Sequence, residues 1–166
     1  MAIQRGVGEV SFISAYLTTR QTSIWFLRRN GKSQSEIGRT LGVQRQGINE
    51  ALRIIDSKLS QALMEAAQSN KLDIRRIDTV NGILEGYSQA YNIPVIVSFS
   101  KSNGVQVWYL YEGKRSTCNR KESCINMLKA EAKERGIDLS DEDLQLPPTE
   151  LGRKIFSTFS KGINPG

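Results

Sequence analysis

The sequence predicts an α+β protein in which an N-terminal helix-turn-helix with a long third helix precedes a small antiparallel β-sheet module packed with helices. Apolar residues recur at helical spacing up to about residue 70. Beyond it, the dipeptides Asn81-Gly82 and Asn103-Gly104 separate short β-rich runs, a pattern typical of hairpins. Helical spacing returns near residue 120. We therefore expect two domains, over residues 1–70 and 71–166.

The composition is that of a folded protein, with 39% hydrophobic and 24% charged residues. No apolar run approaches the roughly 20 residues that span a bilayer, and the N-terminus lacks a signal-peptide pattern, so we expect a cytoplasmic protein without a membrane partner. The chain has no histidine and two cysteines, which excludes a histidine-based triad and a sulfur–imidazole zinc site within one chain. We expect no enzymatic activity, cofactor or metal.

Positive charge is concentrated in the first domain. Residues 1–71 hold 10 Lys and Arg against 5 Asp and Glu, whereas residues 72–166 hold 13 against 12. This asymmetry is typical of a module that binds a polyanion, joined to a nearly neutral module, although a basic face is often only solvated.

Helix signals follow one another over the first 42 residues. Residues 1–17 lack sustained periodicity and are interpreted as an arm. Thr18 or Thr19 is a candidate N-cap for a helix that ends at Asn30-Gly31. Ser33 then caps a second helix, since Glu36 three residues later completes a capping box. The glycine of Leu41-Gly42 ends it.

A third helix begins near Gln44 and meets no breaker after Gly47 until about Asn70, which gives it a length of about 39 Å. Its apolar residues alternate spacings of four and three, as in a coiled coil. This stripe either packs against its own chain or forms a dimer seam, and we favour the seam, composed of Leu52, Ile55, Leu59, Ala62 and Ala66.

The β-rich part predicts two hairpins, of which the second has the stronger signal. If Asn103 and Gly104 are the two loop residues of a type I′ turn, Phe99 faces Trp108 and Val97 faces Leu110. That register gathers one apolar face of the sheet from Val95, Val97, Phe99, Trp108 and Leu110.

Two helices complete the second domain. The first is expected from about Arg120 to Arg135, capped by Asn119 and stopped by Gly136. The acidic stretch DLSDEDLQLPP reads as a loop, and Thr149 opens the last helix.

The second and third helices satisfy the requirements of a helix-turn-helix. Such a pair needs a small residue where the helices cross, a glycine in the turn and apolar residues that lock the crossing. Gly38 supplies the small residue, Gly42 supplies the turn, and the lock is formed by Ile37, Leu41, Val43, Ile48 and Leu52. The alternative is an αα-hairpin without a nucleic-acid role.

A helix-turn-helix would leave polar side chains exposed on the leading turns of the third helix. Arg pairs with guanine, Asn and Gln pair with adenine, and Glu accepts from cytosine, so this face is suited to reading bases. The predicted base-reading residues are Gln44, Arg45, Gln46, Asn49, Glu50 and Arg53. The predicted phosphate contacts are Arg20, Arg28, Arg29, Lys32, Ser33 and Arg39, with a merely solvated charge as the alternative for each basic residue.

Residues 17–52, LTTRQTSIWFLRRNGKSQSEIGRTLGVQRQGINEAL, resemble the N-terminal region of the archaeal Tfx family of DNA-binding transcriptional regulators. The LT.RQ opening, the G.SQ.EI...LG core and the following RQ are the residues that carry the resemblance. It implies a helix-turn-helix similar to those of LuxR-type regulators and sigma factor region 4. Residues 70–166 share only a compatible layout. Trp25-Phe26 departs from the smaller aliphatic residues that are more usual there.

Several alternatives stay open. An RNA-binding or adaptor protein would also carry a basic helical module, although it would usually expose aromatic residues for stacking. A thiol- or metal-responsive sensor would use Cys118 and Cys124, whereas an enzyme with either thiol as nucleophile lacks a recognisable activating base. An unknown small-molecule effector would be bound by aromatic residues of the sheet, namely Tyr87, Tyr91, Phe99, Trp108, Tyr109 and Tyr111.

The expected DNA partner favours a homodimer, because one helix-turn-helix grips only a few base pairs. Two copies related by a two-fold axis would present their recognition helices to successive major grooves. The operator is then expected to be an inverted repeat with half-sites centred about 10 base pairs apart.

Overall fold

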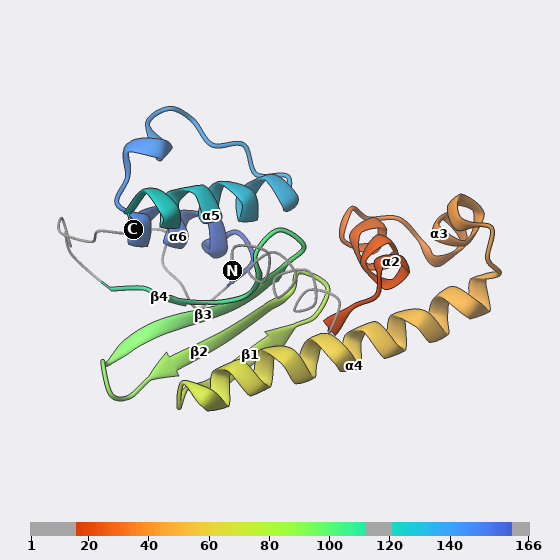
Figure 1. Ribbon diagram of the computed structural model, residues 1–166, viewed down its shortest axis with the longest axis horizontal. Helices are drawn as coiled ribbons and strands as arrows, with labels where there is room; N and C mark the ends of the chain where they lie inside the picture. Colours follow the sequence, from red (N-terminus) through yellow and green to blue (C-terminus); the bar gives the residue numbers. More distant parts are fainter. Residues whose placement is uncertain (1–15, 112–120, 161–166) are drawn as a thin grey trace, which may run out of the picture. The chain divides into compact units, whose positions relative to one another are not determined.

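The computed structural model describes residues 16–111 and 121–160 of the chain (Figure 1). Within these residues the fold is α+β, as predicted: three N-terminal helices, a four-stranded antiparallel sheet and two further helices that pack together. The chain divides into two compact units, Met1–Ala62 and Leu63–Gly166. The division falls inside the third helix rather than after residue 70, so this helix contributes to both units.

Local capping contacts set the first two helix starts. The Thr18 hydroxyl accepts from the Gln21 amide at 3.2 Å, and Gln21 Oε1 accepts from the Thr18 amide at 3.0 Å. Ser33 and Glu36 exchange the same pair of hydrogen bonds, as predicted. The helices of this part are α2 (Thr19–Arg29), α3 (Gln34–Leu41) and α4 (Arg45–Ser69).

The first unit has a core formed by all three helices. Trp25 is fully buried, so the departure from smaller aliphatic residues is accommodated inside the unit. α4 is 25 residues long, or about 37 Å, close to the predicted length. The buried apolar residues of this unit are Leu17, Ile24, Trp25, Ile37, Ile48, Leu52, Ile55, Leu59 and Ala62.

The sheet of the second unit is an antiparallel meander in chain order. The first hairpin turns at Gly82, which adopts a left-handed backbone conformation (φ 64°), in agreement with the predicted Asn81-Gly82 turn. The strands are β1 (Asp73–Asp78), β2 (Ile83–Ser88), β3 (Ile93–Ser100) and β4 (Gly104–Tyr109).

The register predicted for the β3–β4 hairpin is wrong. Phe99 pairs with Val105, and Trp108 pairs with Ile96, so Phe99 and Trp108 lie on opposite faces. Three residues rather than two connect the paired Ser100 and Gly104. The predicted single face of Val95, Val97, Phe99, Trp108 and Leu110 is therefore divided between the two sides of the sheet.

Contacts from the following helix explain this longer turn. The Glu134 carboxylate accepts hydrogen bonds from the Lys101 amide at 3.0 Å and from the Ser102 amide at 2.6 Å. The Asn103 side chain donates to the Met127 carbonyl at 3.0 Å. Because these groups bind turn residues 101–103, tertiary hydrogen bonds override the local preference of Asn-Gly for a two-residue turn.

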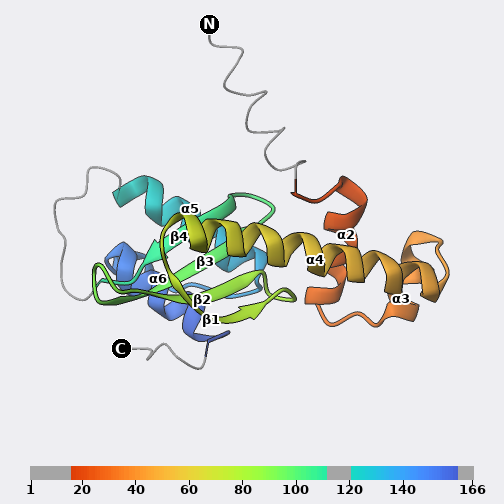
Figure 2. The ribbon, with the colours of Figure 1, turned by 90° about the horizontal axis from the view of Figure 1, so that it is seen from below.

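Helices cover both faces of the sheet. α5 and α6 lie over one face, and the last turns of α4 lie along the other (Figures 1 and 2). Tyr109 Oη donates to Asn70 Oδ1, just beyond α4, at 3.0 Å. The core between the sheet and α5–α6 contains Ile83, Ile96, Leu110, Leu128, Ala132, Leu151, Ile155 and Phe156.

The ends of these helices agree with the sequence signals where the structure describes them. Gly136 is left-handed (φ 68°), as its role as a helix stop requires. The last helix begins at Pro148, one residue before Thr149, because proline is favoured in the first helical turn. The predicted cap Asn119 lies outside the described residues. The elements are α5 (Lys121–Glu134), a 3₁₀ turn η1 (Asp143–Gln145) and α6 (Pro148–Ser157).

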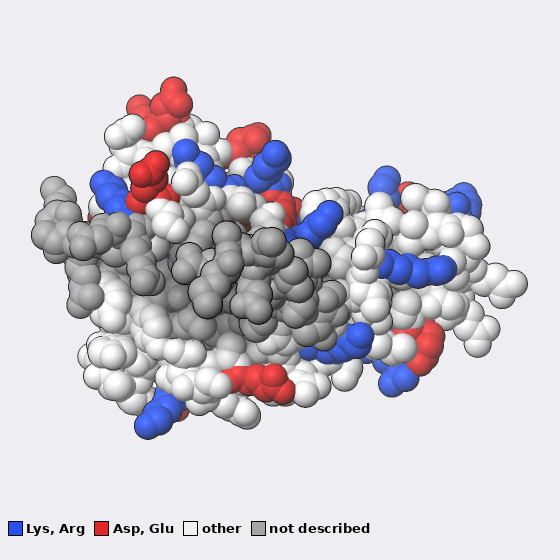
Figure 3. All heavy atoms as spheres, viewed as in Figure 1, with Lys and Arg blue, Asp and Glu red and all other residues white. Residues whose placement is uncertain are grey.

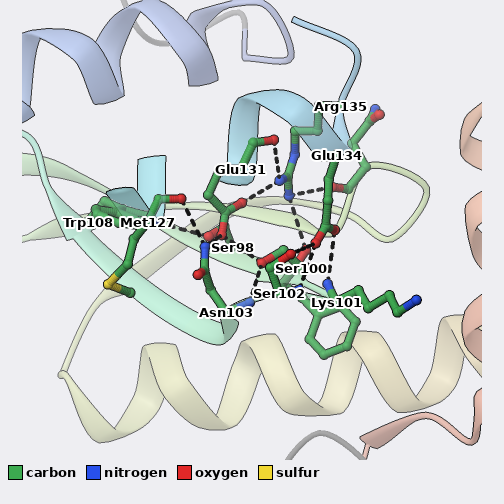
Figure 4. Close-up of polar contacts among 12 residues, drawn as sticks. Ser98, Ser100, Lys101, Ser102, Asn103, Trp108, Met127, Glu131, Glu134 and Arg135 are labelled. Carbon is green, nitrogen blue, oxygen red and sulfur yellow. Dashed lines mark hydrogen bonds and ion pairs between the residues drawn. The ribbon is translucent and has the colours of Figure 1, made fainter. Parts of the chain in front are cut away.

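A buried ion pair connects α5 to the sheet (Figure 4). The side chains of Arg135 and Glu131 are fully buried and bonded to each other. Arg135 Nη2 also donates to the carbonyls of Asn81 at 3.0 Å and Phe99 at 3.1 Å, while Glu131 accepts from the Ser100 hydroxyl at 2.9 Å. The β1–β2 turn, the end of β3 and α5 are thus held together by a single pair of charges.

The substitution Glu131→Gln is expected to lower the free energy of unfolding by about 3–5 kcal/mol, because it leaves the buried Arg135 charge without a counter-ion. Chemical denaturation followed by circular dichroism measures the change. The exposed Glu142 supplies a matched control, and Glu142→Gln is expected to change stability by no more than about 0.5 kcal/mol. Equal effects of the two substitutions would contradict a structural role for the pair.

Candidate nucleic-acid interface

The crossing of α3 and α4 depends on two glycines. A Cβ atom added to Gly38 would lie 2.4 Å from the backbone carbonyl oxygen of Val43, a distance that no side chain tolerates. Gly42 is left-handed (φ 67°) and ends α3, and the Val43 amide donates to the Gly38 carbonyl at 2.8 Å. The predicted roles of these two glycines are confirmed.

Apolar residues lock the same crossing. Ile37, Ile48 and Leu52 are buried, whereas Leu41 and Val43 are half-buried beside the turn. The predicted lock therefore has a buried centre and a partly exposed edge. Because the crossing is tight, the exposed face of α4 has a defined orientation relative to α3.

The predicted base-reading residues form this exposed face. Helical spacing brings Gln46, Asn49 and Arg53 to one side of α4, where all three are exposed, whereas the neighbouring Ile48 and Leu52 are buried. The full set consists of exposed residues: Gln44, Arg45, Gln46, Asn49, Glu50 and Arg53. The structure thus groups all six near the start of α4, where α3 meets it.

Two side-chain contacts organise the face. Gln34 Nε2, at the start of α3, donates to Asn49 Oδ1 at 3.2 Å. Gln34, Arg45, Gln46 and Asn49 line a shallow hollow between the two helices. Sequence reasoning missed Gln34 because its link to Asn49 spans 15 residues and depends on the helix crossing.

The second contact is an ion pair one turn further along α4. Arg53 donates to the Glu50 carboxylate through Nη2 at 2.6 Å and through Nε at 3.2 Å. These hydrogen bonds, with the positive charge of Arg53, lower the pKa of Glu50 below its ordinary value. The carboxylate is therefore ionised at neutral pH, as an ion pair with Arg53 requires.

Four of the predicted phosphate contacts are exposed. Arg20, Lys32 and Arg39 project from the first unit, and Lys32 Nζ lies 4.0 Å from Glu36 Oε1. Ser33 is exposed too, but its hydroxyl accepts the Glu36 amide in the cap of α3. Figure 3 shows basic atoms at several places over α2 and α3.

Arg28 and Arg29 do not fit the predicted phosphate role. Arg28 donates to both carboxylate oxygens of Asp56, at 2.7 and 3.0 Å, and its side chain is only 16% exposed. It fastens α2 to α4. The Arg29 guanidinium lies over the rings of Trp25 at 4.4 Å and Phe26 at 4.9 Å, so it covers aromatic surface of the same helix.

The predicted dimer seam lies mostly inside the chain. Leu52, Ile55, Leu59 and Ala62 are at most 6% exposed, and Ala66 is half-buried. A side chain that its own chain already covers is not available to a second copy. The stripe therefore packs against its own chain, which was the alternative to a dimer seam. A dimer would need another contact surface.

The alternative sites receive little support from the described residues. Among them, no group of three or more His, Cys, Asp and Glu residues is arranged to hold a metal ion. Cys124 is half-buried, and Cys118 lies outside the described ranges. Tyr91, Tyr109 and Tyr111 contact one another, but Trp108 packs toward Phe156, so the predicted aromatic lining does not form one pocket.

Comparisons with protein-family models, curated proteins and solved structures give no match to this chain. The resemblance to the Tfx family therefore stays a prediction from short motifs. No helix in the part of the chain that the structure describes is long and apolar enough to cross a membrane.

The substitution Gly38→Ala is expected to destabilise the helix pair by about 1–3 kcal/mol, because the new Cβ would push against the Val43 carbonyl. Gly152 is a matched control: it is also a buried helical glycine, but a Cβ there would meet its nearest atom at 3.7 Å, an ordinary contact. Gly152→Ala is expected to be neutral or stabilising by up to about 1 kcal/mol.

Urea unfolding of both variants measures the difference. A Gly38→Ala protein as stable as the parent would contradict the tight crossing.

Proposed function

We propose that this protein is a transcriptional regulator that binds double-stranded DNA in a sequence-dependent way through the helix-turn-helix of α3 and α4. The observation that carries the proposal is the set of five exposed polar residues on the leading turns of α4, with the exposed Gln44 just before it, on a helix whose crossing is fixed by Gly38. Amide, guanidinium and carboxylate groups match the donors and acceptors of base edges in the major groove.

The surrounding surface supports duplex DNA over single-stranded RNA. Arg20, Lys32 and Arg39 are exposed around the helix pair and suit backbone phosphates. Readers of single strands expose aromatic rings for stacking. In the described part of the first unit, Trp25 is buried and Tyr16 and Phe26 are half-buried, so no such platform is exposed there.

A dimer is part of the proposal, since a single helix-turn-helix gives little discrimination against a genome of competing sites. Its contact would lie outside the buried residues of α4. Large hydrophobic side chains that stay exposed among the described residues are Ile54, Ile74, Val80 and Tyr91.

Selection from a random duplex library tests the binding mode. The full chain is expected to enrich one duplex sequence, arranged as an inverted repeat with half-sites about 10 base pairs apart. Competition at two salt concentrations then compares that duplex with its single strands and with structured RNA. Enrichment of an unrepeated site would contradict the dimer, and stronger competition by RNA would contradict the function.

The substitution Arg45→Ala is expected to weaken binding to the selected duplex by roughly 1–3 kcal/mol and to relax preference at one base pair, because a bidentate contact is lost. Lys129→Ala, at an exposed position on α5, is the control and is expected to leave affinity unchanged. Fluorescence anisotropy measures both. An equal loss on selected and random duplexes would make Arg45 a phosphate contact instead.

A further inference from the structure

The ion pair of Glu50 and Arg53 lies on the face of α4 that the proposed function assigns to DNA. Both side chains are largely exposed, Arg53 to 73% and Glu50 to 57%. Exposed pairs of this kind contribute little to stability. A contribution to folding therefore does not account for this contact. The N–H donors of Arg53 that Glu50 does not bind remain available to a ligand.

The geometry leaves one complete edge of the guanidinium unoccupied by Glu50. The carboxylate takes the edge formed by Nε and Nη2, at 3.2 and 2.6 Å. A guanidinium has five N–H donors, so the end formed by Nη1 and Nη2 still holds one outward N–H on each nitrogen. That end is the donor pair that fits O6 and N7 of guanine.

We infer that Glu50 is a positioning residue that holds Arg53 for a bidentate contact with the guanine of one G·C base pair. The inference rests on the proposed function and adds to it the chemistry of one position in the bound sequence. Arginine has many rotamers, and ordering it on binding costs affinity. A carboxylate that already fixes the side chain in the free protein removes part of that cost.

A simple electrostatic role for Glu50 predicts a different effect on base preference. If Glu50 only adds negative charge near DNA, its neutralisation strengthens binding to every duplex alike and leaves base preference unchanged. If Glu50 positions Arg53, neutralisation still strengthens binding to random duplexes but weakens the preference for one G·C pair. The ratio of the affinity for the duplex with this G·C pair to the affinity for the duplex in which the pair is replaced therefore distinguishes the two roles.

The test measures affinities of the full chain for the selected duplex and for duplexes in which each base pair is replaced in turn. Arg53→Ala is expected to reduce the preference at one G·C pair by about 5- to 150-fold. Arg53→Lys keeps the charge without the fork and is expected to lose that same preference. Glu50→Gln is expected to reduce it by roughly 2- to 12-fold.

Two controls sharpen the assignment. Glu65→Gln removes an exposed glutamate further along α4 and is expected to leave the preference unchanged. In an Arg53→Ala background, Glu50→Gln should have no further effect on base preference, because Glu50 acts through Arg53. A preference change that persists in that background would show that Glu50 contacts a base itself, and would overturn the inference.

The outcomes also separate this inference from the proposed function. An Arg53→Ala protein that loses affinity equally for all duplexes, or whose affected pair is not G·C, overturns the inference while sequence-dependent binding stands. A parent protein without preference among duplexes overturns the proposed function itself.

Discussion

The close approach of two backbones at Gly38 is the constraint on which the candidate interface depends. Residue 38 has no room for a Cβ, since the Val43 carbonyl occupies the space where one would be. The chain reverses direction immediately after, at a left-handed Gly42. With the crossing fixed in this way, burial of Ile37 and Ile48 orients α4 so that its polar side faces outward.

Side chains of the first unit divide into those that hold the helices and those left for a partner. Arg28 forms an ion pair with Asp56, and Arg29 lies over the rings of Trp25 and Phe26. Arg45 belongs to the exposed group. Net charge alone would have counted all three arginines as equivalent. Their separation shows why positive charge in a sequence overestimates the surface that is available to DNA.

The sequence was most informative where the determining contact is local. The Ser33–Glu36 capping box and the Gly42 turn involve residues at most a few positions apart, so their spacing identifies them. At the first helix, spacing left two candidate caps, Thr18 and Thr19, and the structure adds that Thr18 forms a capping box with Gln21. The fold class and the exposed row on α4 follow from periodicity for the same reason. Charge or a hydroxyl alone could not decide the phosphate contacts in this way: of the six predicted, Arg28, Arg29, Lys32 and Ser33 each have a contact within the unit.

Predictions failed where distant parts of the chain decide the outcome. The hairpin register follows hydrogen bonds between the turn and α5: Glu134 accepts from the Lys101 and Ser102 amides, and Asn103 donates to the Met127 carbonyl. The Asn-Gly rule takes no account of these groups of α5. The stripe containing Leu59 has the same spacing whether its own chain or a second copy covers it, so periodicity could not separate the two. The burial of Glu131 and Arg135 could not be predicted from their spacing, because an (i, i+4) charge pair usually lies on a helix surface.

We propose that DNA is bound by the exposed face of α4. The most direct measurement is the change in backbone amide chemical shifts of the full chain when the selected duplex is added. Among assigned residues, the largest changes are expected between Gln34 and Arg53, with smaller changes in the sheet. Perturbations confined to residues 72–160, with the helix pair unchanged, would contradict it.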